Sequence, residues 1–473
     1  MKLSSLGVIE ANKKYINGEF SAVEMVKDCI ATAKEFEKKN AIIEIFEDAI
    51  SIAEALDNKR ANGEKLGKFA GVVITIKDNI LYAGKKATAA SNFTKNFVST
   101  YTSTALQKLL DEDAIVLGRT NMDEFAIGCD GETSIYGASV NAINDNKIAG
   151  GSSGGSAVAV ALGIGAVSLG SDAGGSARKP AIYNGVCAIK PTYGTVSRHG
   201  LYTLSGSFDQ VSPIARSVKD LAYTLSVIAG NDQYDMTTIC EKSADFNFEN
   251  GVDIKGVSFG VEKNILEKIK GTPVYSKFIE LLDFIKGNGA QVKEIEVEEI
   301  ERAKDVYDVI SSSEIASGFA RFDGLKYTTR ADGVTNIGDL YKKSRKEGFG
   351  KAVRDRIMVG NYALITKGAY QTAKNVSQLL VNNFTKAFSE VDVIVMPTSL
   401  FVAPNKGEKN CNEIEGLLNV VANVTRLPAV AIPFSKNEEN MPYGVSIFAK
   451  ERADKKALEV ASFIENNYKG GNN

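Results

Sequence analysis

The chain has 473 residues, of which 44% are hydrophobic and 24% are charged, a composition typical of a soluble globular protein with a large core. Its 56 basic and 58 acidic residues give a net charge of −2, which excludes the strongly basic field that dominates direct nucleic-acid binding. The five cysteines form no Cys-x-x-Cys pair and histidine occurs once, so we expect no disulfide framework and no metal site in this chain. No apolar run is long enough for a membrane span and no secretory leader is visible, so we expect a cytoplasmic protein.

The N-terminal part of the sequence predicts two helices followed by a buried strand. Ser21 and Glu24 form a capping-box pattern at the start of a helix that runs to Phe36, and a second helix covers about 49–61. The β-branched run 71–76 predicts a strand that carries Lys77 at its carboxyl end. Further along the chain, helices are predicted at 104–110 and 157–162, and strands at 114–117, 167–169, 186–189, 257–261, 292–297, 391–396, 429–433 and 445–448.

This alternation of strands and helices predicts an α/β protein with a large mixed sheet covered by helices. Charge-rich helical sequence fills about 300–388, and no internal repeat or proline-rich linker divides the chain. We therefore favour one continuous domain over two separable domains. Its parts are an N-terminal helical segment at about 1–65, a core at about 66–260, a helical insertion at about 270–390 and a return to the core at about 391–473.

Three short segments carry the candidate catalytic residues. They are Ile-Lys-Asp-Asn at 76–79, Gly-Gly-Ser-Ser-Gly-Gly-Ser at 150–156 and Asp-Ala-Gly-Gly-Ser-Ala-Arg at 172–178. A serine hydroxyl needs a base before it can act as a nucleophile at neutral pH. The segments supply serines, one lysine and a run of glycines, but no histidine. They are the parts of a serine nucleophile that is activated without histidine.

The chain has one histidine, His199, and it lies outside the three segments. A histidine base is therefore disfavoured. The Gly-x-Ser-x-Gly match at 150–154 would make Ser152 a nucleophile elbow, but an elbow follows a strand and 144–149 is typical of a loop. Lysine can replace histidine if burial lowers its pKa, and the end of an apolar strand is suited to that. By itself, Lys77 is also explained as a residue that ends a strand and pairs with Asp78.

The glycine-rich segments do not match phosphate-binding loops, because neither Gly-x4-Gly-Lys-Ser/Thr nor Gly-x-Gly-x-x-Gly is present at a suitable place. A generic loop is the simpler alternative. The second segment favours an oxyanion hole, because Gly174 and Gly175 before Ser176 leave backbone N–H groups open to a bound oxygen. One such donor contributes about 3 kcal/mol in the transition state.

Taken together and in this order, the three segments resemble the pattern of the amidase signature family, and the resemblance extends from Ser21 to about Phe463. It implies the amidase-signature fold, with helices on both faces of the sheet. It implies a triad in which Ser176 is the nucleophile, Ser152 after a cis peptide bond relays protons, and Lys77 is the terminal base. It also implies an oxyanion hole formed by the amides of Ala173, Gly174, Gly175 and Ser176, and supporting roles for Ser153, Asp172 and Arg178.

Stretches outside the triad resemble one subgroup, the A subunits of aspartyl/glutamyl-tRNA amidotransferases. They lie at 120–126, 190–194, 207–210, 320–324 and 345–350. The resemblance implies hydrolysis of glutamine, two partner subunits (B and C), ATP and Mg on a partner with no cofactor in this chain, and tRNA held mainly by a partner. Ammonia would then amidate Glu-tRNA(Gln) or Asp-tRNA(Asn). The glutamine pocket would include Gly128, Cys129, Tyr307 and Arg356.

The sequence departs from the subgroup at several pocket positions. Ala173 replaces a common Thr, and Lys179 stands where Gln is common. Gly416 occupies the position of an Asp that grips the substrate ammonium, so Glu415 or Glu413 would have to substitute for it. These departures keep open a second interpretation, a stand-alone amidase for small aliphatic or aryl amides. A non-catalytic scaffold is disfavoured, because it has no need of a complete triad.

Overall fold

The computed structural model describes residues 2–239, 245–248, 251–327, 329–408, 413–468 and 470. Its strands are β1 (Ile42–Ile45), β2 (Val73–Lys77), β3 (Ile115–Thr120), β4 (Val167–Ser171), β5 (Cys187–Lys190), β6 (Val211–Ala215), β7 (Ser258–Glu262), β8 (Gln291–Ile295), β9 (Val393–Pro397), β10 (Ala429–Lys436) and β11 (Pro442–Ala449). Among the described residues they form one sheet in the order β1-β3-β2-β4-β6-β5-β10-β11-β9-β7-β8. The sheet is mixed, because β2 runs parallel to β3 and β4 whereas β10 runs antiparallel to β5 and β11.

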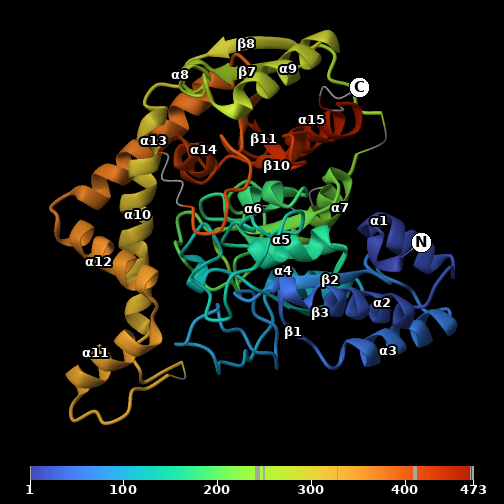
Figure 1. The fold of residues 1–473 in the computed structure, drawn as a ribbon, viewed down its shortest axis with the longest axis vertical. Coiled ribbons are helices and arrows are strands. Elements are labelled where there is room, and N and C mark those ends of the chain that lie inside the picture. Colours follow the sequence, from blue (N-terminus) through green and yellow to red (C-terminus); the bar gives the residue numbers. More distant parts are fainter. Residues whose placement is uncertain are drawn as a thin grey trace.

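The helices that surround this sheet are α1 (Val8–Ile16), α2 (Ala22–Glu35), α3 (Ala49–Ala61), α4 (Thr104–Asp111), α5 (Gly154–Ala161), α6 (Arg178–Tyr183), α7 (Val218–Ile228), α8 (Lys263–Lys268), α9 (Pro273–Gly287), α10 (Ala303–Gly318), α11 (Ile337–Gly348), α12 (Lys351–Ile365), α13 (Ala369–Ala387), α14 (Glu413–Val424) and α15 (Asp454–Asn467). Both α6 and α15 pack on β10 and β11 but not on each other, so they cover opposite faces (Figure 1). α5 packs beside α6, and α7 packs beside α15. The predicted α/β class with helices on both faces is confirmed.

The N-terminal predictions are confirmed in detail. In front of α2, the Ser21 hydroxyl accepts from the Glu24 N–H at 3.1 Å, and the Glu24 carboxylate accepts from the Ser21 N–H at 2.7 Å. This reciprocal pair satisfies two N–H groups that a helix start otherwise leaves open. Strand β2 is buried at every residue and ends at Lys77. Because β2 lies between β3 and β4, Lys77 reaches the inside of the molecule rather than solvent.

Two strands escaped the sequence analysis. β1 belongs to the segment at 1–65, which is therefore not wholly helical, and it pairs antiparallel with β3 at one edge of the sheet. β6 lies between β4 and β5 and contains Pro213. Proline has no N–H to donate and usually marks an edge strand, so the sequence pattern argues against a central strand here.

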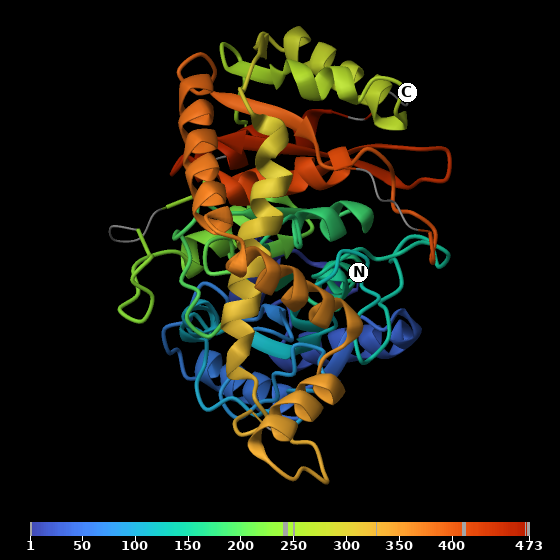
Figure 2. The same cartoon turned by 90° about the vertical axis from the view of Figure 1, so that its left-hand side faces the viewer.

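A group of long helices leaves the sheet between β8 and β9, as the helical sequence at about 300–388 predicts. α10 packs on α12, α13 and α14, and Figure 2 shows α10 and α13 running beside each other. The predicted lower limit of about 270 is wrong, because α9 packs on β8 and β8 pairs with β7 inside the sheet. The helical excursion starts at about 300. None of the helices in the described ranges is both long and apolar enough to cross a membrane.

Candidate active site

Lys77 lies at the centre of a buried cluster of hydroxyl groups. Its Nζ donates hydrogen bonds to the hydroxyl oxygens of Ser152 at 2.7 Å, Ser153 at 2.8 Å and Ser171 at 2.8 Å. The lysine side chain has no solvent exposure. Three neutral acceptors therefore replace water around the amine. The structure brings together Lys77, Ser152 and Ser153 as predicted, and adds Ser171 as a partner that the sequence analysis missed.

Burial lowers the pKa of Lys77 to about 7, although the carboxylates of Asp123, Asp172 and Asp209 oppose this shift. A lysine with such a pKa is partly neutral at physiological pH and can accept a proton. The alternative in which Lys77 simply pairs with Asp78 is wrong. Asp78 binds Arg119 instead, with Nη1 and Oδ1 2.6 Å apart.

A tight glycine turn places Ser152 against Lys77. The peptide bond between Gly151 and Ser152 is cis, as the resemblance implies. A Cβ atom on Gly151 would lie 1.9 Å from a carboxylate oxygen of Asp123, so only glycine fits there. The next residue links this turn to the second serine segment, because the Ser153 N–H donates to the Ser176 carbonyl at 2.9 Å. The two glycine-rich motifs thus form one site.

The turn between β4 and α6 presents Ser176 with backbone N–H groups around it. Gly175 has a φ of +95°, a conformation that favours glycine. Its N–H donates to the Asp172 carboxylate at 2.8 Å and is therefore not available to a substrate oxygen. Within the described ranges, the N–H groups of Ala173, Gly174 and Ser176 donate to no protein acceptor. The structure thus leaves three of the four predicted oxyanion donors free.

Asp172 and Arg178 form a buried ion pair behind this turn. The Arg178 guanidinium binds both carboxylate oxygens of Asp172, at 3.0 and 3.1 Å, and also binds the Asn423 side chain at 2.8 Å. Burial alone would raise the pKa of Asp172, but the Arg178 charge and the hydrogen bonds hold it below its usual range. Asp172 also accepts from the Gly175 N–H, so the ion pair holds this turn in place, and the supporting roles of both residues in catalysis stay a prediction.

We expect Arg178→Met to lower the free energy of unfolding by about 3–5 kcal/mol, because it leaves a buried carboxylate without its counter-charge. Urea unfolding measures the change. Arg302→Met is the matched control: Arg302 is 61% exposed and pairs with Glu299 at the surface, so its loss should cost less than about 1 kcal/mol. Equal losses in the two variants would contradict a structural role for the buried pair.

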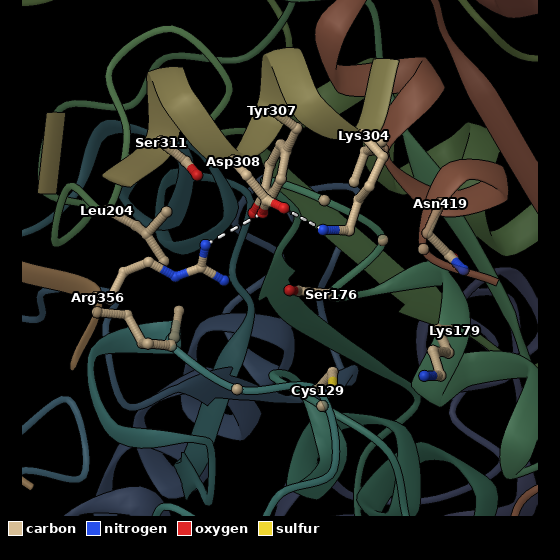
Figure 3. Close-up of a pocket in the computed structure, with 18 of the residues that line it drawn as sticks. Cys129, Ser176, Lys179, Leu204, Lys304, Tyr307, Asp308, Ser311, Arg356 and Asn419 are labelled. Atoms are coloured by element: carbon tan, nitrogen blue, oxygen red, sulfur yellow. Dashed lines mark hydrogen bonds and ion pairs between the residues drawn. The ribbon is translucent and has the colours of Figure 1, made fainter. Parts of the chain in front are cut away.

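Ser176 opens into a pocket of about 440 Å³. All five predicted substrate-binding residues line it, namely Gly128, Cys129, Tyr307, Arg356 and Glu415. Figure 3 shows Ser176 near the centre, with Arg356 on one side and Lys179 on the other. Tyr307 stacks on Phe208 with ring centroids 5.4 Å apart. A Cβ on Gly174 would lie 2.7 Å from the Tyr307 hydroxyl, so the tyrosine is close to the oxyanion turn.

Arg356 is held by an acidic residue that the sequence analysis missed. Its Nη1 donates to Asp308 at 3.1 Å and to the Ser312 hydroxyl at 3.2 Å. Lys304 forms an ion pair with the same Asp308 carboxylate (Figure 3). On α10, Lys304 precedes Tyr307 by three residues and Asp308 by four, the spacings at which helical side chains are neighbours. That spacing could have paired Lys304 with Asp308, but it does not indicate which face of α10 meets the pocket.

Glu415 borders the pocket, but its carboxylate is already engaged. Its oxygens accept from the Leu400 N–H at 2.7 Å and the Tyr183 hydroxyl at 3.3 Å. Burial raises the pKa of Glu415, and the nearby Lys179 ammonium opposes that shift. Glu413 and Gly416 also line the pocket, with Glu413 exposed at its rim. The proposed replacement for the missing acidic residue therefore stays a prediction.

His199 lies outside the pocket, in a stack of aromatic rings. Its ring centroid is 4.9 Å from that of Tyr101 and 4.8 Å from that of Tyr234. Its Nδ1 is 3.2 Å from the Thr104 hydroxyl. The interpretation of His199 as a polar residue near a turn is confirmed. In the part of the chain that the structure describes, no group of three or more His, Cys, Asp or Glu side chains is arranged to hold a metal ion.

Similarity to known proteins extends over nearly the whole chain, and residues 24–458 match the Amidase family. The A subunit of the glutamyl-tRNA(Gln) amidotransferase from Lactobacillus acidophilus is 41% identical over 463 residues, which cover 96% of this chain and 95% of that protein. A solved structure of the A subunit of the Thermotoga maritima glutamyl-tRNA(Gln) amidotransferase is 30% identical with a TM-score of 0.82, covering 99% of this chain and 96% of that one. A crystal structure of an amidase is 29% identical with a TM-score of 0.84, covering 98% and 100%. The chain therefore belongs to the Amidase family.

Proposed function

We propose that this protein is the glutamine-hydrolysing A subunit of a tRNA-dependent amidotransferase. The observation that carries the proposal is the contact of Lys77 with Ser152 beside a pocket that holds both Ser176 and Arg356. Relatives named as A subunits of glutamyl-tRNA(Gln) amidotransferases match this chain along almost their full length, which supports the same assignment. Arg356 suits a glutamine substrate, because a guanidinium binds a carboxylate with two parallel hydrogen bonds.

In the first half of the reaction, the Ser176 hydroxyl oxygen attacks the carboxamide carbon of glutamine and a C–O bond forms. The hydroxyl proton passes to Ser152, which in turn gives its own proton to neutral Lys77. The N–H groups of Ala173, Gly174 and Ser176 stabilise the negative oxygen that develops. The C–N bond then breaks, and the proton returns from Lys77 through Ser152 to the leaving nitrogen, which departs as ammonia.

In the second half, water attacks the resulting ester between glutamate and Ser176. The same relay removes a proton from the water and returns one to the serine oxygen, so that glutamate is released and the triad is restored. We propose that the ammonia passes to a partner subunit, one of two (B and C), which binds ATP and Mg²⁺ and amidates Glu-tRNA(Gln) or Asp-tRNA(Asn). In this proposal the tRNA is held mainly by that partner and the complex is cytoplasmic.

A second candidate function, hydrolysis of small aliphatic or aryl amides by the lone chain, is favoured by one observation. Gly416 offers no carboxylate to a substrate ammonium, and its Cβ position faces the Lys304 side chain at 2.9 Å. An amide without an ammonium group does not need such a partner. The similarity to a solved amidase is compatible with this candidate.

We expect glutamate release from glutamine only when the chain is combined with two partner subunits and substrate tRNA. The measurement compares the lone chain with the reconstituted complex, and Ser176→Ala in the same complex supplies the blank. The proposal would be wrong if neither form cleaved glutamine while the lone chain hydrolysed butyramide or benzamide. That result would establish the stand-alone amidase instead.

A further inference from the structure

Glu124 is a buried carboxylate that contacts the start of α12. The residue is 1% exposed. Its Oε1 accepts from the Ser91 hydroxyl at 2.5 Å, and its Oε2 accepts from the Gly350 N–H at 2.9 Å. Gly350 is the N-cap residue of α12 and has no side chain to cap the helix itself. Because a buried carboxylate needs polar partners and is favourable near a helix N-terminus, Glu124 ties α12 to the core.

The contact between Glu124 and Gly350 leaves no room for a side chain. A Cβ atom on Gly350 would lie 2.3 Å from Glu124 Oε2. The backbone of Gly350 has φ −65° and ψ 169°, a conformation that other residues adopt without strain. The glycine is therefore required by the neighbouring carboxylate and not by the backbone turn.

The start of α12 bears on the pocket because the same helix carries Arg356, less than two helical turns after Gly350. α12 packs on α10 and α13 at the outer side of the molecule (Figure 1). Its other face is open to solvent, with Met358, Tyr362 and Ile365 between 69% and 81% exposed. Since α12 is supported from one side, a change at its N-terminus should shift the Arg356 guanidinium relative to Ser176.

An aromatic cluster holds the residue before Gly350 without fixing the direction of the helix. The Phe349 ring centroid is 4.8 Å from that of Phe93 and 5.8 Å from that of Phe125. Apolar burial of this kind is non-directional, whereas a hydrogen bond to a carboxylate has a preferred angle. The cluster therefore keeps the junction in the core, and the contact with Glu124 sets the direction in which α12 starts.

We propose that Glu124 is a positioning residue for the substrate carboxylate, which acts by holding α12 so that Arg356 faces Ser176. Glu124 itself does not line the described pocket, so it acts without touching the substrate. This inference rests on the proposed glutamine hydrolysis, in which Arg356 binds the carboxylate, and deepens it. It follows that loss of Glu124 weakens substrate binding and leaves the chemical step intact.

The first test measures ammonia release from glutamine by the reconstituted complex. Glu124→Leu should raise KM about tenfold and leave kcat within about threefold, because a displaced guanidinium loses part of a charged hydrogen bond while the triad is unaltered. Glu124→Gln should keep KM within about threefold of the original, because its amide oxygen can still accept from the Gly350 N–H and its NH₂ group can donate to Ser91.

Gly350→Ala disturbs the same contact from the side of α12, and it keeps the inference testable if Glu124→Leu does not fold. It should raise KM about as much as Glu124→Leu does. The matched control is Glu298→Leu, which replaces a glutamate that is 69% exposed and should change neither constant. A fall in kcat that exceeds the rise in KM, in both Glu124→Leu and Gly350→Ala, would overturn the inference.

A double-substitution cycle tests whether the effect passes through Arg356. In a complex that already carries Arg356→Met, adding Glu124→Leu should raise KM by less than about twofold, because the group that Glu124 positions is absent. Equal effects of Glu124→Leu with and without Arg356 would show that Glu124 supports the structure in general, and would overturn the inference.

Hydrogen exchange separates this inference from the proposed function, because it needs no substrate. In the complex, Glu124→Leu should speed exchange of the amides in 351–357 and leave those of α15 unchanged. Unaltered exchange in 351–357 would overturn the inference. Glutamine hydrolysis with an unaltered KM in Glu124→Leu would also sink it and leave the glutaminase intact. Faster exchange in a complex that never hydrolyses glutamine would support the anchoring of α12 and contradict the glutaminase.

Discussion

Ser176→Ala is expected to lower kcat for glutamine hydrolysis by about 10⁴- to 10⁶-fold, the range found when the nucleophile of a serine hydrolase is removed. The substitution deletes one oxygen at the centre of the pocket and leaves the oxyanion donors in place. Steady-state ammonia release from the reconstituted complex measures the loss. Circular dichroism and thermal unfolding of the variant should match those of the unchanged protein, because Ser176 makes no side-chain hydrogen bond to another described residue.

The only other strong nucleophile near Ser176 in the described pocket is Cys129, and it is not expected to rescue the variant. Desolvation within the pocket raises the pKa of the Cys129 thiol to about 12 although the residue as a whole is exposed, so the reactive thiolate is scarce at neutral pH. Ser389→Ala, which removes an exposed serine remote from the pocket, is the matched control and should retain full activity. The role of Ser176 is refuted if the variant keeps more than about 1% of activity and Cys129→Ala then abolishes the remainder.

Local sequence patterns were enough to predict most of the sheet. The β-branched run before Lys77 predicts a strand unambiguously, because its strand propensity, its apolar character and the loop that follows all indicate the same structure. β6 was not predicted, because the proline Pro213 is unusual in a central strand. Its central position becomes apparent only from its pairing with β4 and β5 in the folded sheet. The start of the helical excursion was misplaced for a related reason. The sequence of α9 predicts a helix, but it does not show whether that helix packs on the sheet or projects from it. The pairing of β8 with β7 places α9 on the sheet.

In the candidate site, too, some residues could be predicted from the sequence and others could not. The candidate triad and oxyanion turn lie in short motifs, and the resemblance of those motifs to a known family, rather than residue type alone, predicted their roles. One part of the pocket wall comes from α10, α12 and α14, which lie more than 100 residues along the chain from Ser176. Which face of α10 meets Ser176 depends on how the helices pack, so Asp308 and Lys304 could not be assigned a role from spacing alone. The engaged state of Glu415 on α14 depends likewise on the backbone N–H of Leu400, a contact that sequence spacing does not predict.

Lys77 is the proposed terminal base, and its loss should also have a large effect on catalysis. We expect Lys77→Met to lower kcat about 10³- to 10⁵-fold, because the hydroxyl protons of Ser152 and Ser176 then have no acceptor. In the unchanged protein, kcat/KM should rise about tenfold per pH unit below pH 7 and level off above it, since only neutral Lys77 accepts a proton and its pKa is about 7. Ammonia release from pH 5.5 to 9 measures this profile. A flat profile across pH 7 would argue against lysine as the base.

The buried amine of Lys77 should also make the stability of the protein increase with pH above pH 7. The pKa of Lys77 is about 7 in the folded protein, against 10.5 for a solvated lysine, so between these values the unfolded chain binds one more proton. The free energy of unfolding contributed by this residue therefore rises with pH from 7 to 10.5, by up to about 5 kcal/mol, and is constant below pH 7. Lys77→Met lacks this dependence. We expect the stability of the unchanged protein relative to Lys77→Met to increase between pH 7 and pH 9.5 in urea unfolding, whereas Lys386→Met, at an exposed site, should show no such trend. A difference that stays constant or shrinks over this interval would show that Lys77 is already protonated in the folded protein, and would remove it as the base.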